Sequence, residues 1–92
     1  MQGLTSTLAL ELGRFNINVN AVAPGYIATS MTAATADRLG STFEEHQHAA
    51  AARTPLKRVG QPEEVASVIA FLASEDASYV SGQTLYINGG AR

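Results

Sequence analysis

The chain is 92 residues long, carries a formal net charge of −2 and contains no cysteine. This length allows one small domain at most, and the slightly acidic balance excludes the basic stripe of a nucleic-acid-binding protein. Without cysteine there are no disulfides and no thiolate metal sites. No apolar run approaches the ~20 residues of a membrane span, and the first residues do not resemble a secretion signal. We therefore expect a cytoplasmic chain with no nucleic-acid or membrane partner.

The first segment predicts a helix over Gln2–Leu12. Leu4, Leu8 and Leu12 recur every four residues and form one apolar stripe, and Gly13 then supplies a stop. No capping residue precedes the pattern. We interpret this start as a cut through a larger structural unit.

The next segment predicts a strand over Asn16–Ala23. Its apolar residues alternate with asparagines, and this period of two is typical of a strand. Pro24-Gly25 then marks a turn. We expect one of these asparagines, Asn20, to bond neighbouring backbone rather than a ligand.

Two further helices and a second strand follow. A capping box, either Ser41-x-x-Glu44 or Thr42-x-x-Glu45, predicts a helix that runs to about Arg53. The next helix is predicted to begin at Pro62-Glu63-Glu64. The proline suits a first helical position, and the two glutamates fill the first turn. Gln83–Asn88 reads as a short strand with Leu85 and Ile87 on one face.

This order of elements predicts an α/β fold with a parallel sheet and helical crossovers. Two strands alone do not make a stable parallel sheet, because such sheets need several neighbouring strands and cover on both faces. The missing strands come from elsewhere, or the chain is poorly folded alone.

Five stretches agree in order and spacing with one known family: Leu8–Leu12, Ile17–Gly25 with Thr29 four residues later, Arg58–Ala66, Tyr79–Gln83 and Asn88–Gly90. On these residues the chain resembles the short-chain dehydrogenase/reductase family, in particular its 3-oxoacyl-carrier-protein reductase-like members. The resemblance covers essentially residues 1–92. It implies the C-terminal part of a Rossmann-like doubly wound parallel sheet, ordered helix, strand, helical lid, helix, strand.

The resemblance also implies a cofactor, NAD or NADP, and a site. Pro24, Gly25, Ile27 and Thr29 would lie at the nicotinamide end, with the Ile27 backbone bonding the carboxamide. Ligands of open α/β sheets do bind outside the carboxyl ends of the strands, and a glycine allows close backbone approach. Residues 30–54 would form a lid over a small carbonyl or alcohol substrate. Members of the family commonly form homo-tetramers.

The catalytic Tyr-x-x-x-Lys and the glycine-rich phosphate loop of the family are absent from these 92 residues. None of Tyr26, Tyr79 and Tyr86 has a lysine four residues later, so we assign no catalytic residue. We expect a parent oxidoreductase that interconverts a ketone or aldehyde and an alcohol. The isolated chain should be inactive and bind cofactor weakly or not at all. The substrate and the choice between NAD and NADP stay open.

Three other interpretations were weighed against this one. The first is a non-catalytic remnant that self-associates or serves as an interaction subunit. A cofactor-binding module without chemistry is disfavoured, because the missing phosphate contacts carry much of such affinity. A metal site at His46 and His48 is disfavoured as well, because residues two apart on a helix point to different faces.

Overall fold

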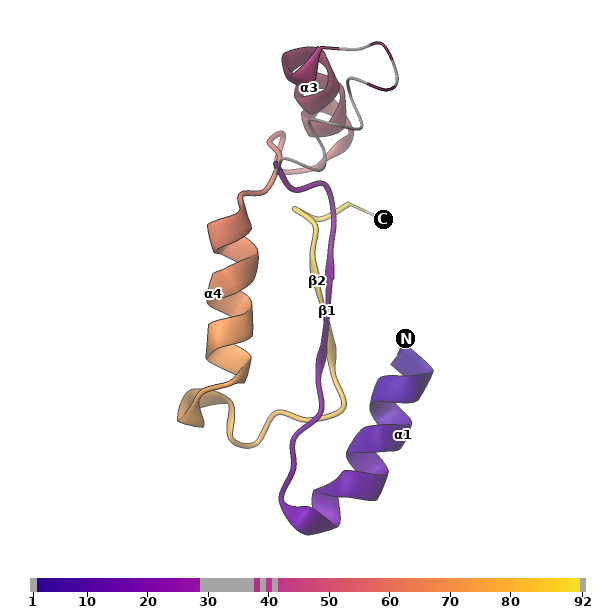
Figure 1. The fold of residues 1–92 in the computed structure, drawn as a ribbon, viewed down its shortest axis with the longest axis vertical. Helices are drawn as coiled ribbons and strands as arrows, with labels where there is room; N and C mark the ends of the chain where they lie inside the picture. The colour runs from indigo at the N-terminus through magenta and orange to yellow at the C-terminus, as the bar shows by residue number, and fades with distance from the viewer. Residues whose placement is uncertain (1, 29–37, 39, 41, 92) are drawn as a thin grey trace. The chain divides into compact units, whose positions relative to one another are not determined.

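The computed structural model describes residues 2–28, 38, 40 and 42–91, and the findings below concern these residues. The elements, in chain order, are α1 (Gln2–Leu12), the 3-10 turn η1 (Gly13–Phe15), β1 (Ala21–Pro24), α3 (Phe43–Arg53), α4 (Pro62–Leu72), the 3-10 turn η2 (Glu75–Ala77) and β2 (Thr84–Ile87). The two strands lie side by side in one parallel sheet (Figure 1). The chain divides into two compact units, residues 1–23 with 66–86 and residues 24–65 with 87–92, and each is described separately.

The three predicted helices are confirmed. Helix α1 ends at Leu12, one residue before the glycine stop. Helix α3 begins after Thr42, whose hydroxyl accepts the Glu45 N–H at 3.0 Å and donates to the Glu45 carboxylate at 2.9 Å. The second of the two alternative capping boxes is thus the one formed in the structure. Helix α4 begins at Pro62, as its first-turn chemistry predicts.

The first strand is shorter than its alternating pattern predicts, since β1 covers only Ala21–Pro24. Asn16 adopts a left-handed conformation with φ of 61°. The asparagine side chains then bond the loop that precedes β2: the Asn18 amide donates to the Ser78 carbonyl at 3.1 Å, and the Asn20 amide donates to the Val80 carbonyl at 3.0 Å. These side-chain bonds act beside one backbone bond, in which the Gly82 N–H donates to the Val19 carbonyl at 2.7 Å. The expectation that Asn20 bonds backbone is confirmed.

The second strand lies within the predicted range Gln83–Asn88. Strand β2 covers Thr84–Ile87, and Leu85 is exposed although Ile87 is half-buried. A period of two produces alternating burial only where a second layer covers one face of the sheet. Within the described residues, no such layer covers Leu85.

Little of the described chain is buried. Three described residues are buried, Thr5, Ala50 and Ala77, whereas Leu10 is 85% exposed and Tyr86 is 58% exposed. A core of two alanines is far smaller than a stable domain needs. The described part of the chain therefore presents large apolar side chains to solvent. Over the described part of the chain, no helix has the length and apolar character needed to cross a membrane.

Candidate functional site

The loop that leaves the carboxyl end of β1, residues 24–28, is held on two sides. The Gly25 N–H donates to the Ile87 carbonyl at 3.0 Å, which continues the pairing of the two strands. Further along, the Gly60 N–H donates to the Tyr26 carbonyl at 3.0 Å, and the Ala28 N–H donates to the Gly60 carbonyl at 2.9 Å. These two bonds form a parallel bridge between Ile27 and Gly60. Beyond the end of β1 the chain thus bends at Tyr26 and then pairs with Gly60 through a single bridge at Ile27.

The bridge determines where the peptide groups of Ile27 point. In a parallel bridge, the central residue of one segment forms hydrogen bonds with the two residues that flank its partner on the other segment. Gly60 bonds the Tyr26 carbonyl and the Ala28 N–H. The N–H and C=O of Ile27 therefore face away from Gly60. One edge of the loop therefore offers a donor and an acceptor from one residue. A primary carboxamide carries the complementary acceptor and donors.

Two glycines permit this assembly. A Cβ atom at position 25 would lie 2.9 Å from the Cβ and 3.1 Å from the Cα of Asn88. A Cβ atom at position 60 would lie 2.6 Å from the Cδ1 of Ile27. The loop therefore passes closer to its neighbours than any other residue type would allow without displacement.

The turn after β2 supports the same loop. Gly89 and Gly90 have φ values of 63° and 91°, in the region that favours glycine. The Asn88 side chain closes the turn, because its amide donates to the Ala91 carbonyl at 2.8 Å and its oxygen accepts the Gly90 N–H at 3.1 Å. The Leu56 N–H donates to the Gly89 carbonyl at 3.1 Å. This turn holds Asn88 against Gly25.

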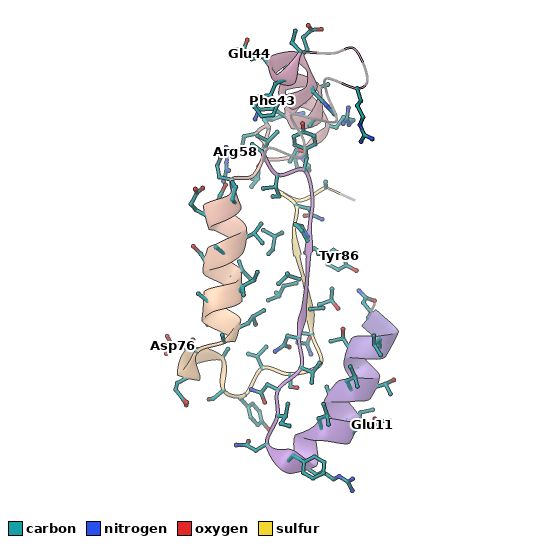
Figure 2. The ribbon with its side chains drawn as sticks, viewed as in Figure 1. Glu11, Phe43, Glu44, Arg58, Asp76 and Tyr86 are labelled. Carbon is teal, nitrogen blue, oxygen red and sulfur yellow. The ribbon has the colours of Figure 1, made fainter. Side chains whose placement is uncertain are left out.

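An ion pair fixes the chain just before α4. Arg58 donates to both carboxylate oxygens of Glu64, each at 2.8 Å, and the same carboxylate accepts the Gln61 N–H at 3.0 Å. Figure 2 shows Arg58 beside the first turn of α4. The hydrogen bonds from Arg58, and then the one from Gln61, lower the pKa of Glu64 from 4.5 to about 2. The bond to Glu64 likewise raises the pKa of Arg58.

The lowered pKa of Glu64 gives a pH dependence of stability. Because the folded pKa lies below the unfolded value, the small stabilisation from the solvent-exposed Glu64 bonds is fully present above pH 4.5 and is lost as the pH falls toward about 2. Glu64→Gln is expected to flatten the dependence of the urea midpoint on pH in that window. Glu44→Gln, a matched change in the first turn of α3, serves as the control. Equal pH slopes in the wild-type protein and the Glu64 variant would contradict this expectation.

Tyr26 and His46 join the loop to α3. Their rings meet edge to face, with centroids 5.2 Å apart. In the described part of the chain the Tyr26 hydroxyl and the His46 Nδ1 are buried atoms without a hydrogen-bond partner. His48 is exposed, and the described residues contain no cluster of three or more His, Asp or Glu side chains that could hold a metal ion. His46 is thus half-buried, whereas His48 is exposed. The absence of a metal site remains a prediction.

Removal of the Tyr26 hydroxyl is expected to cost nothing in stability. A buried hydroxyl without a partner carries a desolvation penalty, so Tyr26→Phe should leave the free energy of unfolding unchanged or raise it by up to ~1 kcal/mol. Tyr86→Phe is the matched control, since the Tyr86 hydroxyl accepts the Gln2 amide at 2.6 Å. That variant should lose about 0.5–1 kcal/mol. Denaturant unfolding of both variants tests the contrast, and a larger loss for Tyr26→Phe would contradict it.

The structure brings three of the four sequence-predicted contacts, Pro24, Gly25 and Ile27, together on one loop. Thr29 and most of residues 30–41 lie outside the described residues. The sequence placed Glu64 in the first turn of a helix and Asn88 at the end of a strand, but it gave neither of them a role in holding this loop. Gly60 and Arg58 were marked only by their membership of a stretch that carries the family resemblance.

Comparison with known proteins shows the family of the chain. The profile of the family described as enoyl-(acyl carrier protein) reductase matches residues 1–92. The chain belongs to the short-chain dehydrogenase/reductase (SDR) family. Over 88 residues, this SDR chain is 51% identical to the 3-oxoacyl-(acyl-carrier-protein) reductase FabG of Thermotoga maritima and 47% identical to that of Aquifex aeolicus. It is 48% identical to the reductase MabA of Mycobacterium tuberculosis. Each match covers 96% of the SDR chain.

Solved structures extend the likeness to the fold. YwfH, an NADPH dependent reductase involved in bacilysin biosynthesis, matches 99% of the SDR chain with a TM-score of 0.88 and 35% identity, over 36% of its own length. A short chain dehydrogenase family protein from Francisella tularensis matches 97% with a TM-score of 0.84 and 33% identity, over 38% of its length. The predicted α/β class is confirmed. The SDR chain spans about a third of the length of the curated relatives it matches.

Proposed function

We propose that residues 1–92 form the C-terminal part of the Rossmann-fold domain of an NAD(P)(H)-dependent oxidoreductase that interconverts a ketone or aldehyde and an alcohol. Three relatives at 47–51% identity bear the name 3-oxoacyl-(acyl-carrier-protein) reductase, which favours a 3-oxoacyl thioester as the carbonyl substrate. The observation that carries the proposal is the bridge between Ile27 and Gly60 at the carboxyl end of β1.

In this proposal Pro24, Gly25, Ile27 and Thr29 contact the nicotinamide end of the cofactor. The outward N–H and C=O of Ile27 match the two halves of the nicotinamide carboxamide. Gly25 has no side chain, so the loop can lie close to Asn88. The Gly25 N–H also donates to the carbonyl of Ile87, the last residue of β2. When bound, the cofactor supplies or accepts the hydride. The residues of this chain hold and orient its carboxamide end, and residues 30–54 form a lid over the substrate.

The proposal assigns no catalytic acid to the 92 residues, because no tyrosine among them has a lysine four positions later. A carbonyl oxygen that accepts a hydride needs a proton donor nearby. The isolated 92-residue polypeptide is therefore expected to reduce no carbonyl substrate and to bind neither NADH nor NADPH measurably. Titration of reduced-cofactor fluorescence tests this, and saturable quenching at micromolar concentrations would contradict it.

The activity itself is tested on the polypeptide purified from its source at native length. Oxidation of NADH and NADPH is followed with a 3-oxoacyl thioester and, separately, with a trans-2-enoyl thioester. Turnover of the 3-oxoacyl substrate with one of the two cofactors is expected. Turnover of the enoyl substrate alone would place the reaction at a carbon–carbon double bond and overturn the carbonyl assignment. No turnover of either substrate would contradict the assignment as well.

The carboxamide contact has a test of its own that needs no variant. A cofactor analogue with an acetyl group in place of the carboxamide keeps the carbonyl acceptor but loses the N–H donors to the Ile27 carbonyl. Loss of one such hydrogen bond is expected to weaken binding about tenfold, close to 1.4 kcal/mol. Equal affinities for the analogue and the natural cofactor would contradict the contact with Ile27.

A second candidate function is a non-catalytic subunit that self-associates. The exposed apolar side chains of α1 favour it, since Leu10 is 85% and Leu4 is 64% exposed, and uncovered apolar surface promotes association. The same surface suits a homo-oligomer of an active reductase. Sedimentation of the native-length protein, together with the turnover assay, separates the two cases. Association without turnover would favour the non-catalytic subunit.

A further inference from the structure

We infer that Arg58 and Glu64 are positioning residues for the nicotinamide-side loop. Their ion pair fixes the four residues from Arg58 to Gln61, and Gly60 within that segment is the residue that pairs with the loop on both sides of Ile27. The inference rests on the proposed function for the identity of the bound group. The mechanical link between the ion pair and the loop can be tested without it.

The Arg58–Glu64 ion pair lies on the surface and is geometrically well defined. Both side chains are open to solvent, at 56% and 42% exposed, and exposed pairs of this kind contribute little to overall stability. Their geometry is unusually well defined for a surface contact, because two parallel bonds of 2.8 Å join the guanidinium to the carboxylate. Such bidentate pairs add directional specificity. The expected effect is local order rather than global stability.

The Glu64 carboxylate also restrains the backbone that follows Arg58. The Glu64 carboxylate also accepts the Gln61 N–H at 3.0 Å, so one carboxylate holds both ends of the segment from Arg58 to Gln61. Only Val59 and Gly60 lie between these ends. Glycine has more backbone freedom to lose than any other residue. Holding Arg58 and Gln61 in place reduces the freedom of Gly60, which lowers the entropy cost of its pairing with the loop.

Gly60 connects this restrained segment to the loop. Gly60 donates to the Tyr26 carbonyl and accepts from the Ala28 N–H, with lengths of 3.0 and 2.9 Å. A shift of Gly60 by a fraction of these lengths would lengthen both bonds together. The peptide groups of Ile27 lie between them and would change direction. The ion pair is thus coupled to the Ile27 N–H and C=O, which are proposed to bond the nicotinamide carboxamide.

The variant that isolates the link is Arg58→Met in the native-length protein. It removes the clamp but leaves the bond between Glu64 and the Gln61 N–H, so α4 keeps its N-terminal capping bond. The matched control is Arg53→Met, which removes the same charge from the last turn of α3. The conservative variant Arg58→Lys, whose ammonium cannot form the two parallel bonds, should fall between the wild-type protein and Arg58→Met.

Two readouts are measured. Amide hydrogen exchange at Gly60 and Ala28 should accelerate about tenfold in Arg58→Met, because a locally opened segment exchanges faster at an unchanged global stability. The KM for the nicotinamide cofactor should rise several-fold, while the KM for the carbonyl substrate stays near its wild-type value. Arg53→Met should change neither quantity.

The outcomes separate this inference from the proposed function. Faster exchange at both amides in a protein that binds no cofactor would support the positioning role and overturn the assignment of the bound group. Wild-type exchange rates in Arg58→Met would overturn the positioning role, whether or not the protein binds cofactor. A rise in the KM for the carbonyl substrate alone would overturn it as well, because the coupling runs to the cofactor loop.

Discussion

Replacement of Gly25 by alanine is expected to lower the free energy of unfolding by about 1–3 kcal/mol, the usual cost of an extra methyl group in a closely packed site. The added carbon would lie 2.9 Å from the Cβ and 3.1 Å from the Cα of Asn88. Asn88 cannot easily move aside, since its own side chain closes the turn after β2. The loop would have to move instead, which should also weaken cofactor binding.

Urea unfolding of the native-length protein measures this effect, with Gly3→Ala as the matched control. Gly3 is the second residue of α1, and no atom of the described residues lies within 4 Å of its expected Cβ position. Alanine has a higher helix propensity than glycine, so the control should gain up to about 0.5 kcal/mol. The two variants should therefore shift the midpoint in opposite directions. A Gly25 variant as stable as the wild-type protein would contradict the close contact with Asn88.

Gly89→Ala is expected to have an even larger effect, about 2–4 kcal/mol, because two penalties act together. Gly89 has a φ of 63°, where a side chain is strained, and its Cβ would lie 2.6 Å from the Cγ2 of Thr54. Thr54 is a β-branched residue with few alternative rotamers, and its hydroxyl already donates to the Ala50 carbonyl at 2.9 Å. The contact cannot be relieved by a simple rotation.

Gly40→Ala separates the two penalties. Gly40 has a φ of 76°, similar to that of Gly89, but no atom of the described residues lies within 4 Å of its expected Cβ position. This variant should show the conformational penalty alone, about 1–2 kcal/mol. The difference between the two variants measures the contact with Thr54. Equal losses of unfolding free energy would mean that the turn after β2 does not pack on Thr54.

The sequence predicted those parts of the fold whose signals are local. The first turn of α4 carries proline and two glutamates, and the start of α3 carries a threonine three residues before a glutamate, so both helices begin where predicted. The predicted start of the first strand, at Asn16, was wrong for a physical reason. Alternation over Asn16–Ala23 describes an extended chain, but it cannot reveal that Asn18 and Asn20 bond a loop some 60 residues away.

The site was predictable to a lesser degree. Pro24-Gly25 marks a turn in any sequence, and only the family resemblance turned it into a cofactor contact. The residues that hold the loop, Gly60 and Asn88, lie more than 30 positions from their partners in the chain. No periodic pattern encodes contacts of that range. The bridge to Gly60 and the ion pair that fixes it therefore emerged from the structure alone.

The intact mass of the polypeptide that carries these residues in its source is the most direct test of the central proposal. The matched relatives are roughly three times as long as the matched stretch, so a mass near three times 9.6 kDa is expected for an oxidoreductase of which residues 1–92 form the C-terminal part. A single species at 9.6 kDa would contradict that proposal and would favour the self-associating, non-catalytic subunit.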